Sequence, residues 1–355
     1  MELVRFNADF YMDLALRCAW DSQLLALPNP TVGALILDKH SRIIALEAHS
    51  KSGEPHAELK ACKNAYIALK GDDFEALQNL HSANEIYDFL VANHKGILRD
   101  CSIFITLEPC NHYGKTPPCA ELLKALEIKQ IFFSVDENSA DSRGGADNLA
   151  HFGAKITRGI LRDKGEDLLY PFVKLRDSGT LRVFKVAQRL NGSFENGIIS
   201  SNDSRTYSHK LRTIAQQIII STKTILNDNP LLDSRLSGGH SEFSGESSAG
   251  KAPNVCILGS SESLKKCEDR NLRIYSVPNR AVGFYENIDL LPMQGFSIIE
   301  GGADMFESLK DKIDLLLIFI SAKMARGRNF HSDFGGRILW ANRVGWDIAL
   351  WIKPS

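Results

Sequence analysis

Gly53-Glu-Pro-His-Ala-Glu58 is the stretch around which the first half of this chain is organised. It places the imidazole of His56 two residues before the carboxylate of Glu58. Further along, Leu107-Glu-Pro-Cys110 and Pro117-Pro-Cys119 add two thiols. One imidazole and two thiolates leave the fourth position of a tetrahedral zinc ion open for water, whose pKa such an ion lowers towards neutrality. The sequence therefore predicts a zinc site with an open corner and a nearby carboxylate to move protons.

The positions of these residues on the expected elements favour the same chemistry. A helix is expected to begin near His56, which puts Glu58 in its first turn. A strand over 102–107 and a helix over 120–126 place Cys119 at a helix N-terminus, where a thiol is held as the metal-binding thiolate. His-x-Glu followed by a Pro-Cys and a second Cys is typical of zinc-dependent deaminases. The alternative, a structural zinc or no metal, lacks an obvious fourth protein ligand.

Composition limits the classes of protein that remain. The chain has 355 residues, enough for two domains, with 44% hydrophobic and 24% charged residues. Its formal net charge is −1 and it has no long basic run, which argues against nucleic-acid or membrane partners. No apolar run approaches the ~18 residues of a membrane span, and the start lacks a signal-peptide pattern. Seven irregularly spaced cysteines favour reduced thiols and a cytoplasmic location.

The first half alternates strands with helices, which predicts a three-layer α/β unit with a mostly parallel sheet. Strands are expected over 34–37, 43–48, 102–107, 131–135 and 151–160, with helices over 9–25, from 56 onward and over 120–126. Residues 68–98 interrupt this order as a helical excursion on the surface. The charged segment 161–174 is predicted to be a linker.

These motifs closely resemble the deaminase half of the bifunctional RibD-type family of riboflavin biosynthesis. The resemblance rests on Asn29-Pro-Thr-Val-Gly, His49, Gly-Glu-Pro-His56-Ala-Glu58 and Thr106-Leu-Glu-Pro-Cys110 through Gly-Lys-Thr-Pro-Pro-Cys119. It implies a diaminopyrimidinone substrate that carries a phosphoribosylamino group. It also implies zinc ligands His56, Cys110 and Cys119, a proton-moving Glu58, and substrate contacts from Asn29, His49, His112 and Lys115. Taken alone, Asn29 between two prolines is more simply a turn residue.

The second half is predicted to be another α/β unit. Strands are expected from 184, over 217–221, 255–258, 274–277 and 315–320, helices over 204–214 and 305–309, and a turn over 226–230. Ser297-Ile-Ile-Glu-Gly-Gly302 places two glycines before a helix, a weak signal for a phosphate-binding turn and more simply a structural one. The absence of Gly-x-Gly-x-x-Gly near a strand argues against a Rossmann fold.

Motifs in this half resemble the reductase half of the same family, whose fold is similar to dihydrofolate reductase. They are Lys185-Val-Ala, Leu-Asn-Gly192, Leu211-Arg212, Thr224 to Arg235 and Glu300-Gly-Gly302. The resemblance implies that NADPH reduces the ribosyl chain of the deaminated product. It implies NADPH contacts from Ala187, Ile198, Ser200, Thr224, Asp228 and the Gly301-Gly302 turn, and substrate contacts from Arg212, Leu231, Arg235 and Glu300.

The second half departs from the family pattern in three places. The usual Asp of the Leu-Asp-Gly turn is Asn191, the usual Trp-Ile-Thr is Ile198-Ile-Ser200, and an arginine usually found soon after Pro253 is absent. These changes keep open an alternative in which an active deaminase is joined to a degenerate reductase. Two further alternatives are a nucleic-acid deaminase with a non-catalytic appendage, which predicts a basic groove, and a zinc-stapled binding protein without turnover.

The overall expectation is therefore two domains and two cofactors. Residues 1–162 are predicted to form a cytidine-deaminase-like, zinc-dependent domain with a surface insertion at about 68–98. Residues 175–355 are predicted to form a dihydrofolate-reductase-like, NADPH-dependent domain. The expected partners are a small phosphoribosylated pyrimidine and a second copy of the chain, with no nucleic acid and no membrane.

Overall fold

The structure, a computed structural model, contains two compact units, Met1–Phe172 (unit 1) and Val173–Ser355 (unit 2). It describes residues 7–70, 75–114, 117–139, 142–195, 197–237, 252–268, 271–292 and 294–355. The segment predicted to be a linker, 161–174, is not an extended connection. Most of it lies in helix α7 (Arg162–Ser178), which continues across the boundary between the units.

Unit 1 is built on a five-stranded sheet with the order β2-β1-β3-β4-β5. Its strands are β1 (Gly33–Leu37), β2 (Ile43–Ala48), β3 (Ser102–Leu107), β4 (Gln130–Val135) and β5 (Lys155–Thr157). Strand β1 pairs antiparallel with β2 and β3, whereas β3, β4 and β5 are parallel. Strands β2, β3, β4 and β5 therefore run in one direction, as expected of a mostly parallel sheet. Strand β1 alone runs against them, because a short turn joins β1 to β2, and such a turn can connect only antiparallel strands.

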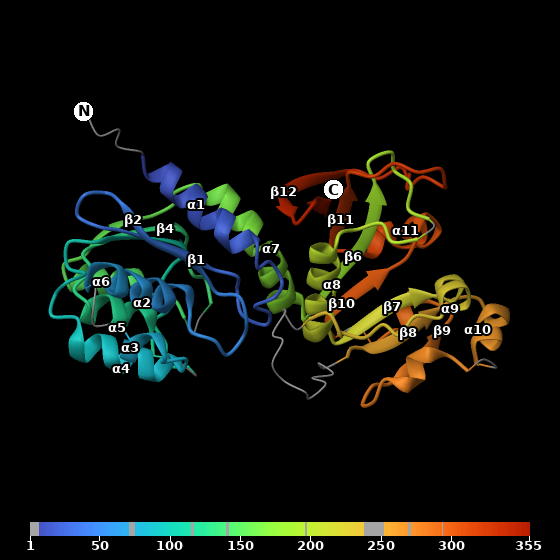
Figure 1. Cartoon of the computed structure of the whole chain (residues 1–355), viewed down its shortest axis with the longest axis horizontal. Coiled ribbons are helices and arrows are strands. Elements are labelled where there is room, and N and C mark those ends of the chain that lie inside the picture. Colours follow the sequence, from blue (N-terminus) through green and yellow to red (C-terminus); the bar gives the residue numbers. More distant parts are fainter. Residues whose placement is uncertain are drawn as a thin grey trace. The chain divides into compact units, whose positions relative to one another are not determined.

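Helices cover both faces of this sheet, with α1 (Ala8–Trp20) on one face and α2 (Ala57–Lys70) on the other (Figure 1). Helix α1 lies directly on β1, because a Cβ added at Gly33 would stand 2.1 Å from the carbonyl oxygen of Ala15. The helix ends five residues earlier than predicted, and the turn after it includes Leu24 with a φ of 67°. This close packing fixes the start of β1, and with it the loop that carries Asn29.

The excursion at 68–98 is helical as predicted, with α3 (Glu75–Gln78) and α4 (Ala83–Asn93). It has its own buried side, formed by Leu77, Ile86 and Leu90. Helix α5 (Cys119–Ala125), whose first residue is the second motif cysteine, begins one residue earlier than predicted. Helix α6 (Gly145–His151) was not predicted, since its seven residues start with glycine and offer little apolar periodicity.

Unit 2 is built on an eight-stranded sheet with the order β12-β13-β11-β6-β10-β7-β8-β9. Strands β11, β6, β10, β7, β8 and β9 are parallel, and the β12–β13 hairpin is added antiparallel to β11. Their bounds are β6 (Thr180–Arg189), β7 (Gln217–Ser221), β8 (Asn254–Leu258), β9 (Val282–Tyr285), β10 (Gly295–Glu300), β11 (Leu315–Ser321), β12 (Gly336–Val344) and β13 (Asp347–Pro354). The carboxyl ends of β6, β10 and β7 therefore meet at one edge, where α/β sheets bind ligands.

The helices of unit 2 are α8 (Asn202–Ile214), α9 (Thr222–Asp228), α10 (Ser261–Glu268) and α11 (Ala303–Leu309), with short 3₁₀ turns at Arg273–Ser276, Ile288–Leu290 and Lys310–Lys312. Two predictions fail here. Most of the turn expected over 226–230 belongs to α9, which ends where Asn229 adopts a φ of 39°. The strand expected over 274–277 is one of the 3₁₀ turns, and the true edge strand, β9, lies a few residues later. The Gly/Ser-rich composition of residues 237–250 predicts a mobile loop, but after Ser237 this stretch lies outside the described residues.

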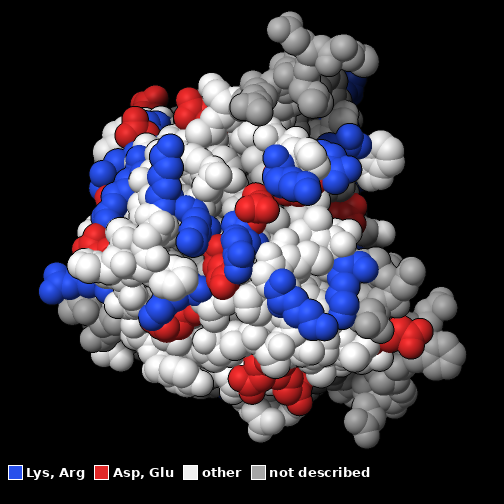
Figure 2. All heavy atoms as spheres, turned by 90° about the vertical axis from the view of Figure 1, so that its left-hand side faces the viewer, with Lys and Arg blue, Asp and Glu red and all other residues white. Residues whose placement is uncertain are grey.

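Within the described part of the chain, no helix is long and apolar enough to cross a membrane. The face drawn in Figure 2 carries Lys and Arg side chains interspersed with Asp and Glu, and it shows no continuous basic track. This mixture agrees with the formal net charge of −1.

Candidate metal centre

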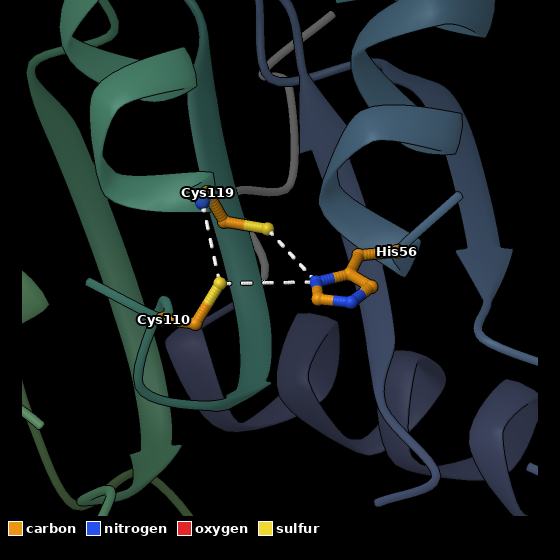
Figure 3. A group of neighbouring side chains, drawn as sticks. All are labelled: His56, Cys110 and Cys119. Atoms are coloured by element: carbon orange, nitrogen blue, oxygen red, sulfur yellow. Dashed lines mark hydrogen bonds between the residues drawn. The ribbon is translucent and has the colours of Figure 1, made fainter. Parts of the chain in front are cut away.

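Three side chains from separate segments of unit 1 converge on one point, as Figure 3 shows. His56 immediately precedes α2, Cys110 follows β3 by three residues, and Cys119 is the first residue of α5. The Nδ1 atom of His56 lies 3.8 Å from the Sγ of Cys110 and 3.4 Å from the Sγ of Cys119. All three potential ligand atoms lie within 4.8 Å of one another.

This geometry fits a tetrahedral zinc ion. With metal–ligand bonds of about 2.0–2.3 Å, two ligands of one tetrahedral ion lie roughly 3.3–3.8 Å apart. A hydrogen bond from the Cys119 thiol lowers the pKa of Cys110 to about 4 and raises that of Cys119, so the two sulfurs share one proton. A metal ion would displace that proton, since thiolates are the ligating form. One imidazole and two soft sulfurs favour zinc over harder cations such as Mg²⁺.

Glu58 lies in the first turn of α2 and lines the same cavity as His56 and Cys110. Its side chain is buried, and burial raises its pKa. A buried carboxylate beside a metal site is well placed to accept and return a proton.

The cavity at this centre has a volume of about 460 Å³. Among the predicted substrate-contacting residues, Asn29, His49 and His112 line it, whereas Lys115 lies outside the described residues. Sequence reasoning did not single out several other lining residues, namely Glu54, Glu108, Glu137, Ser139, Ser142 and Phe172. Of these residues, only Glu54 and Glu108 could have been found from the sequence, because they lie inside the motifs Gly53–Glu58 and Leu107–Cys110.

Asn29 and His49 form a polar pair on the cavity wall. The amide nitrogen of Asn29 lies 3.3 Å from Nε2 of His49, and Nδ1 of His49 lies 3.3 Å from the carbonyl oxygen of Pro55. Burial, with the charge of His56 nearby, lowers the pKa of His49 to about 4, so this imidazole is neutral at pH 7. A neutral ring that donates from Nδ1 to Pro55 accepts at Nε2 from Asn29, which is consistent with both contacts.

Unit 2 contains a second cluster of predicted site residues, centred on Glu300 at the carboxyl end of β10. Arg212 on α8 donates to both carboxylate oxygens of Glu300, at 2.9 and 3.0 Å, and Lys185 on β6 lies 3.5 Å away. Burial alone would raise the pKa of Glu300, but the charges of Arg212 and Lys185 outweigh it and bring that pKa to about 2. Lys185 was quoted in a motif but given no role, although it faces Glu300 directly across the β6–β10 pairing.

The remaining predicted substrate residues lie on the loop after α9. The second guanidinium nitrogen of Arg212 donates to the main-chain carbonyl of Asp233 at 3.1 Å, and Arg235 pairs with the Asp233 carboxylate at 3.0 Å. Leu231 contributes its carbonyl to Arg280, which also binds the carbonyl of Leu232. Asp233 thus links Arg212 and Arg235, while Arg280 clamps the start of the loop.

The residues predicted to meet NADPH lie on several elements of unit 2. Ala187 lies within β6, Thr224 in the first turn of α9, and Asp228 is exposed at the end of that helix. In the loop before α8, Ile198 is 65% exposed and Ser200 is half-buried. Within the described residues, these side chains form no hydrogen bonds or ion pairs with one another, in contrast to the three converging side chains of unit 1.

The Gly301-Gly302 turn has a packing explanation. A Cβ at Gly301 would lie 2.5 Å from Sδ of Met305, and one at Gly302 would lie 2.6 Å from the ring of Phe194. A side chain at either position would therefore have to displace Met305 or Phe194, whatever the two glycines also bind.

Asn191, which departs from the family pattern, uses both ends of its amide. Its nitrogen donates to the carbonyl of Ala325 at 2.9 Å, and its oxygen accepts from the Ser193 hydroxyl at 3.2 Å. An aspartate would lack the donor. The substitution therefore suits the local structure of this chain.

Comparison with known proteins agrees with these features. Residues 7–135 match the family described as cytidine and deoxycytidylate deaminase zinc-binding region. The riboflavin biosynthesis protein RibD of Bacillus amyloliquefaciens is 32% identical over 64% of this chain and 55% of its own length, so the chain matches little more than half of that relative. RibD of Chlamydia muridarum is 27% identical over 85% of this chain and 81% of its own length.

A crystal structure of a diaminohydroxyphosphoribosylaminopyrimidine deaminase/5-amino-6-(5-phosphoribosylamino)uracil reductase from Thermotoga maritima has a similar fold. It superposes with a TM-score of 0.62 at 24% identity and covers 98% of both chains. The predicted cytidine-deaminase-like fold of unit 1 is thereby confirmed, and the chain as a whole, with two α/β units in sequence, has the fold of this deaminase/reductase.

Proposed function

We propose that the chain belongs to the RibD family of riboflavin biosynthesis proteins, which its relatives and its deaminase region support, and that it is a bifunctional enzyme of that biosynthesis. Unit 1 hydrolyses the ring amino group of a diaminopyrimidinone that carries a phosphoribosylamino group. Unit 2 then reduces the ribosyl chain of the product to ribityl with NADPH. The observation that carries the proposal is the convergence of His56, Cys110 and Cys119 on one point of a cavity that Glu58 also lines.

In the first reaction, water replaces an amino group and ammonia leaves. Zinc held by His56, Cys110 and Cys119 would supply the Lewis acid that makes water a nucleophile near neutral pH. Glu58 takes a proton from the attacking water and returns it to the departing amino group. Asn29 and the neutral His49 offer a polar wall for the heterocycle, and we place His112 and Lys115 at the phosphoribosyl end, where a cation suits phosphate.

In the second reaction, the protein holds the NADPH carbon against the substrate carbon, and positioning supplies most of the rate. We propose NADPH contacts from Ala187, Ile198, Ser200, Thr224, Asp228 and Gly302, and substrate contacts from Arg212, Leu231, Arg235 and Glu300. Arg235 is the better-placed partner for the substrate phosphate because its side chain is 55% exposed, whereas Arg212 is occupied by Glu300. We also propose that residues 1–162 form the deaminase domain and residues 175–355 form the reductase domain.

The test supplies the diaminopyrimidinone phosphate to the full chain with and without NADPH. Ammonia, zinc content and NADPH oxidation are measured on the same sample. We expect ammonia release without NADPH, and NADPH oxidation only after deamination. Ammonia without any NADPH oxidation would support the alternative of a degenerate reductase, whereas no ammonia from a zinc-loaded protein would reject the assignment of unit 1.

We also propose a cytoplasmic, homo-oligomeric protein that binds neither nucleic acid nor membranes. The near-zero net charge and the interspersed charges of Figure 2 support the absence of nucleic-acid binding, because such binding relies on many unopposed cations. Tight RNA binding at physiological salt would instead favour a nucleic-acid deaminase. Light scattering during size-exclusion chromatography measures the oligomeric state.

A further inference from the structure

Glu108 is a buried carboxylate that the proposed chemistry does not use. Only 6% of it is exposed, and it stands two residues before Cys110. One of its oxygens accepts from the main-chain N–H of Glu137 at 3.0 Å, and the other accepts from that of Ala146 at 2.9 Å. We propose that Glu108 is a positioning residue, which ties the chain before Cys110 to the described residues of the segment 137–146, namely 137–139 and 142–146. This inference rests on the proposed function, in which Cys110 is a metal ligand.

A second contact fixes the same stretch of main chain. A Cβ added at Gly145 would stand 1.9 Å from the carbonyl oxygen of Pro109, so the start of α6 presses directly on the peptide that precedes Cys110. On the other side of the cysteine, the N–H of Asn111 donates to the carbonyl of Ser142 at 3.1 Å. The main chain is therefore held on both sides of Cys110 by one segment.

The same segment forms part of the cavity wall. Glu137, Ser139 and Ser142 line the cavity, and the hydroxyl of Ser142 lies 2.9 Å from Nδ1 of His112. Glu108 thus couples two parts of the site, namely the position of a metal ligand and the wall that faces the substrate.

The chemistry of the position requires a carboxylate of this length. Both partners are N–H donors, and an ionised carboxylate offers two acceptor oxygens and no donor. In E108Q the amide NH₂ would face one of those N–H groups and leave it unpaired, and in E108D the shorter side chain would not reach both. Loss of a group that orients a metal ligand typically weakens metal binding by about 10- to 100-fold.

The experiment measures metal binding on the full-length chain. Wild type, E108Q and the control E121Q are stripped with a chelator and titrated with Zn²⁺ and, separately, with Co²⁺, whose absorption reports the ligand geometry. Glu121 is a matched control because it stands two residues from the other cysteine, yet its side chain is 40% exposed and its partners are the side chains of Lys124 and Asn148 rather than main-chain N–H groups. We expect E108Q to bind Zn²⁺ about 10- to 100-fold more weakly with an altered Co²⁺ spectrum, and E121Q to match wild type.

Restoration of the Co²⁺ spectrum in E108D would contradict the length requirement. Wild-type affinity and spectrum in E108Q, with its circular dichroism retained, would overturn the inference and leave the proposed function intact. Failure of wild type to bind metal through Cys110, shown by no loss in C110S, would overturn both. If E108Q does not fold, E108D decides the matter, because it keeps the carboxylate but cannot reach both N–H groups, and it is expected to bind Zn²⁺ more weakly than wild type.

Discussion

The candidate site residues of the two units differ in whether their charges are already balanced by one another. In unit 1, His56, Cys110 and Cys119 face one another across less than 4.8 Å, and the sulfurs share a proton that a metal ion can displace. In unit 2, Glu300 is neutralised by Arg212 and Lys185, so the cluster is complete without a ligand. The first arrangement suits a metal ion, whereas the second would have to exchange internal partners in order to bind the substrate proposed for it.

This difference shows why a metal site is easier to recognise than a substrate site. Three ligands of fixed chemistry at the ends of secondary-structure elements have few other uses in one place. A buried ion pair, in contrast, occurs equally in structural networks, and its presence alone is weak evidence of function or stability. The comparison can be tested with single substitutions in each unit.

The largest effect is expected for E58Q in unit 1. Glutamine keeps the size of the side chain but cannot take a proton, so the deamination rate should fall by about 10²- to 10⁴-fold. Zinc content should remain that of wild type, because Glu58 is not one of the three ligands. The measurement pairs ammonia release with metal analysis of the same preparation. Unchanged turnover in a zinc-loaded E58Q would remove Glu58 from the mechanism.

In unit 2, E300Q should reduce stability rather than only activity. It leaves the buried side chains of Arg212 and Lys185 as neighbouring cations without a counter-charge, and breaking a buried pair in this way typically costs about 3–5 kcal/mol. Denaturant unfolding measures the loss. The control E307Q changes a carboxylate that is 53% exposed in its pair with Lys310 and should have little effect. Equal stability of E300Q and wild type would show that the cluster is not tightly coupled.

The sequence sufficed for most of unit 1, because its motifs mark the ends of strong elements. In unit 1 the sequence patterns predicted β2 and β3, and in unit 2 they predicted β11, each within one residue. The motifs also placed His56 and Cys119 correctly at the starts of helices. The predictions that failed concern elements and contacts that depend on tertiary packing. The strand predicted near Ile274 is a 3₁₀ turn, and the short strand β9 at the sheet edge carries too little apolar pattern to be recognised. The bonds of Glu108 could not be predicted, since its partner Glu137 lies in a loop and its partner Ala146 lies in the short helix α6, and neither stretch shows periodicity.

A smaller effect concerns the pH dependence of unit 2. Burial, together with the charge of Arg212, lowers the pKa of His209 to about 4, and its Nδ1 accepts from the N–H of Leu236. Because the folded pKa lies below the ordinary value near 6.5, the unfolded chain binds the extra proton first. Stability should therefore be complete above pH ~6.5 and fall as the pH drops towards 4.

H209Q should flatten this decline, since glutamine does not titrate. The control H331Q removes an exposed histidine and should leave the decline in place. The thermal midpoint at pH 7 and at pH 5 is the measurement, and a shift of a few degrees is expected for wild type. An equal decline in wild type and H209Q would assign the acid sensitivity to other groups, such as His49 in unit 1, whose pKa is also about 4, whereas Glu300 acts only at lower pH because its pKa is about 2.

The smallest effect is expected for N191D, which restores the residue usual in the resembling reductases. In this chain the amide nitrogen of Asn191 donates to Ala325, so an aspartate would place a carboxylate oxygen against a carbonyl oxygen. Because Asn191 is exposed and water can intervene, the loss of stability should be only about 1 kcal/mol. The KM for NADPH in N191D separates two explanations of the departure. An unchanged or higher KM means that the asparagine is adapted to its neighbour, whereas a markedly lower KM would mean that the turn has lost a cofactor contact and that unit 2 is partly degenerate.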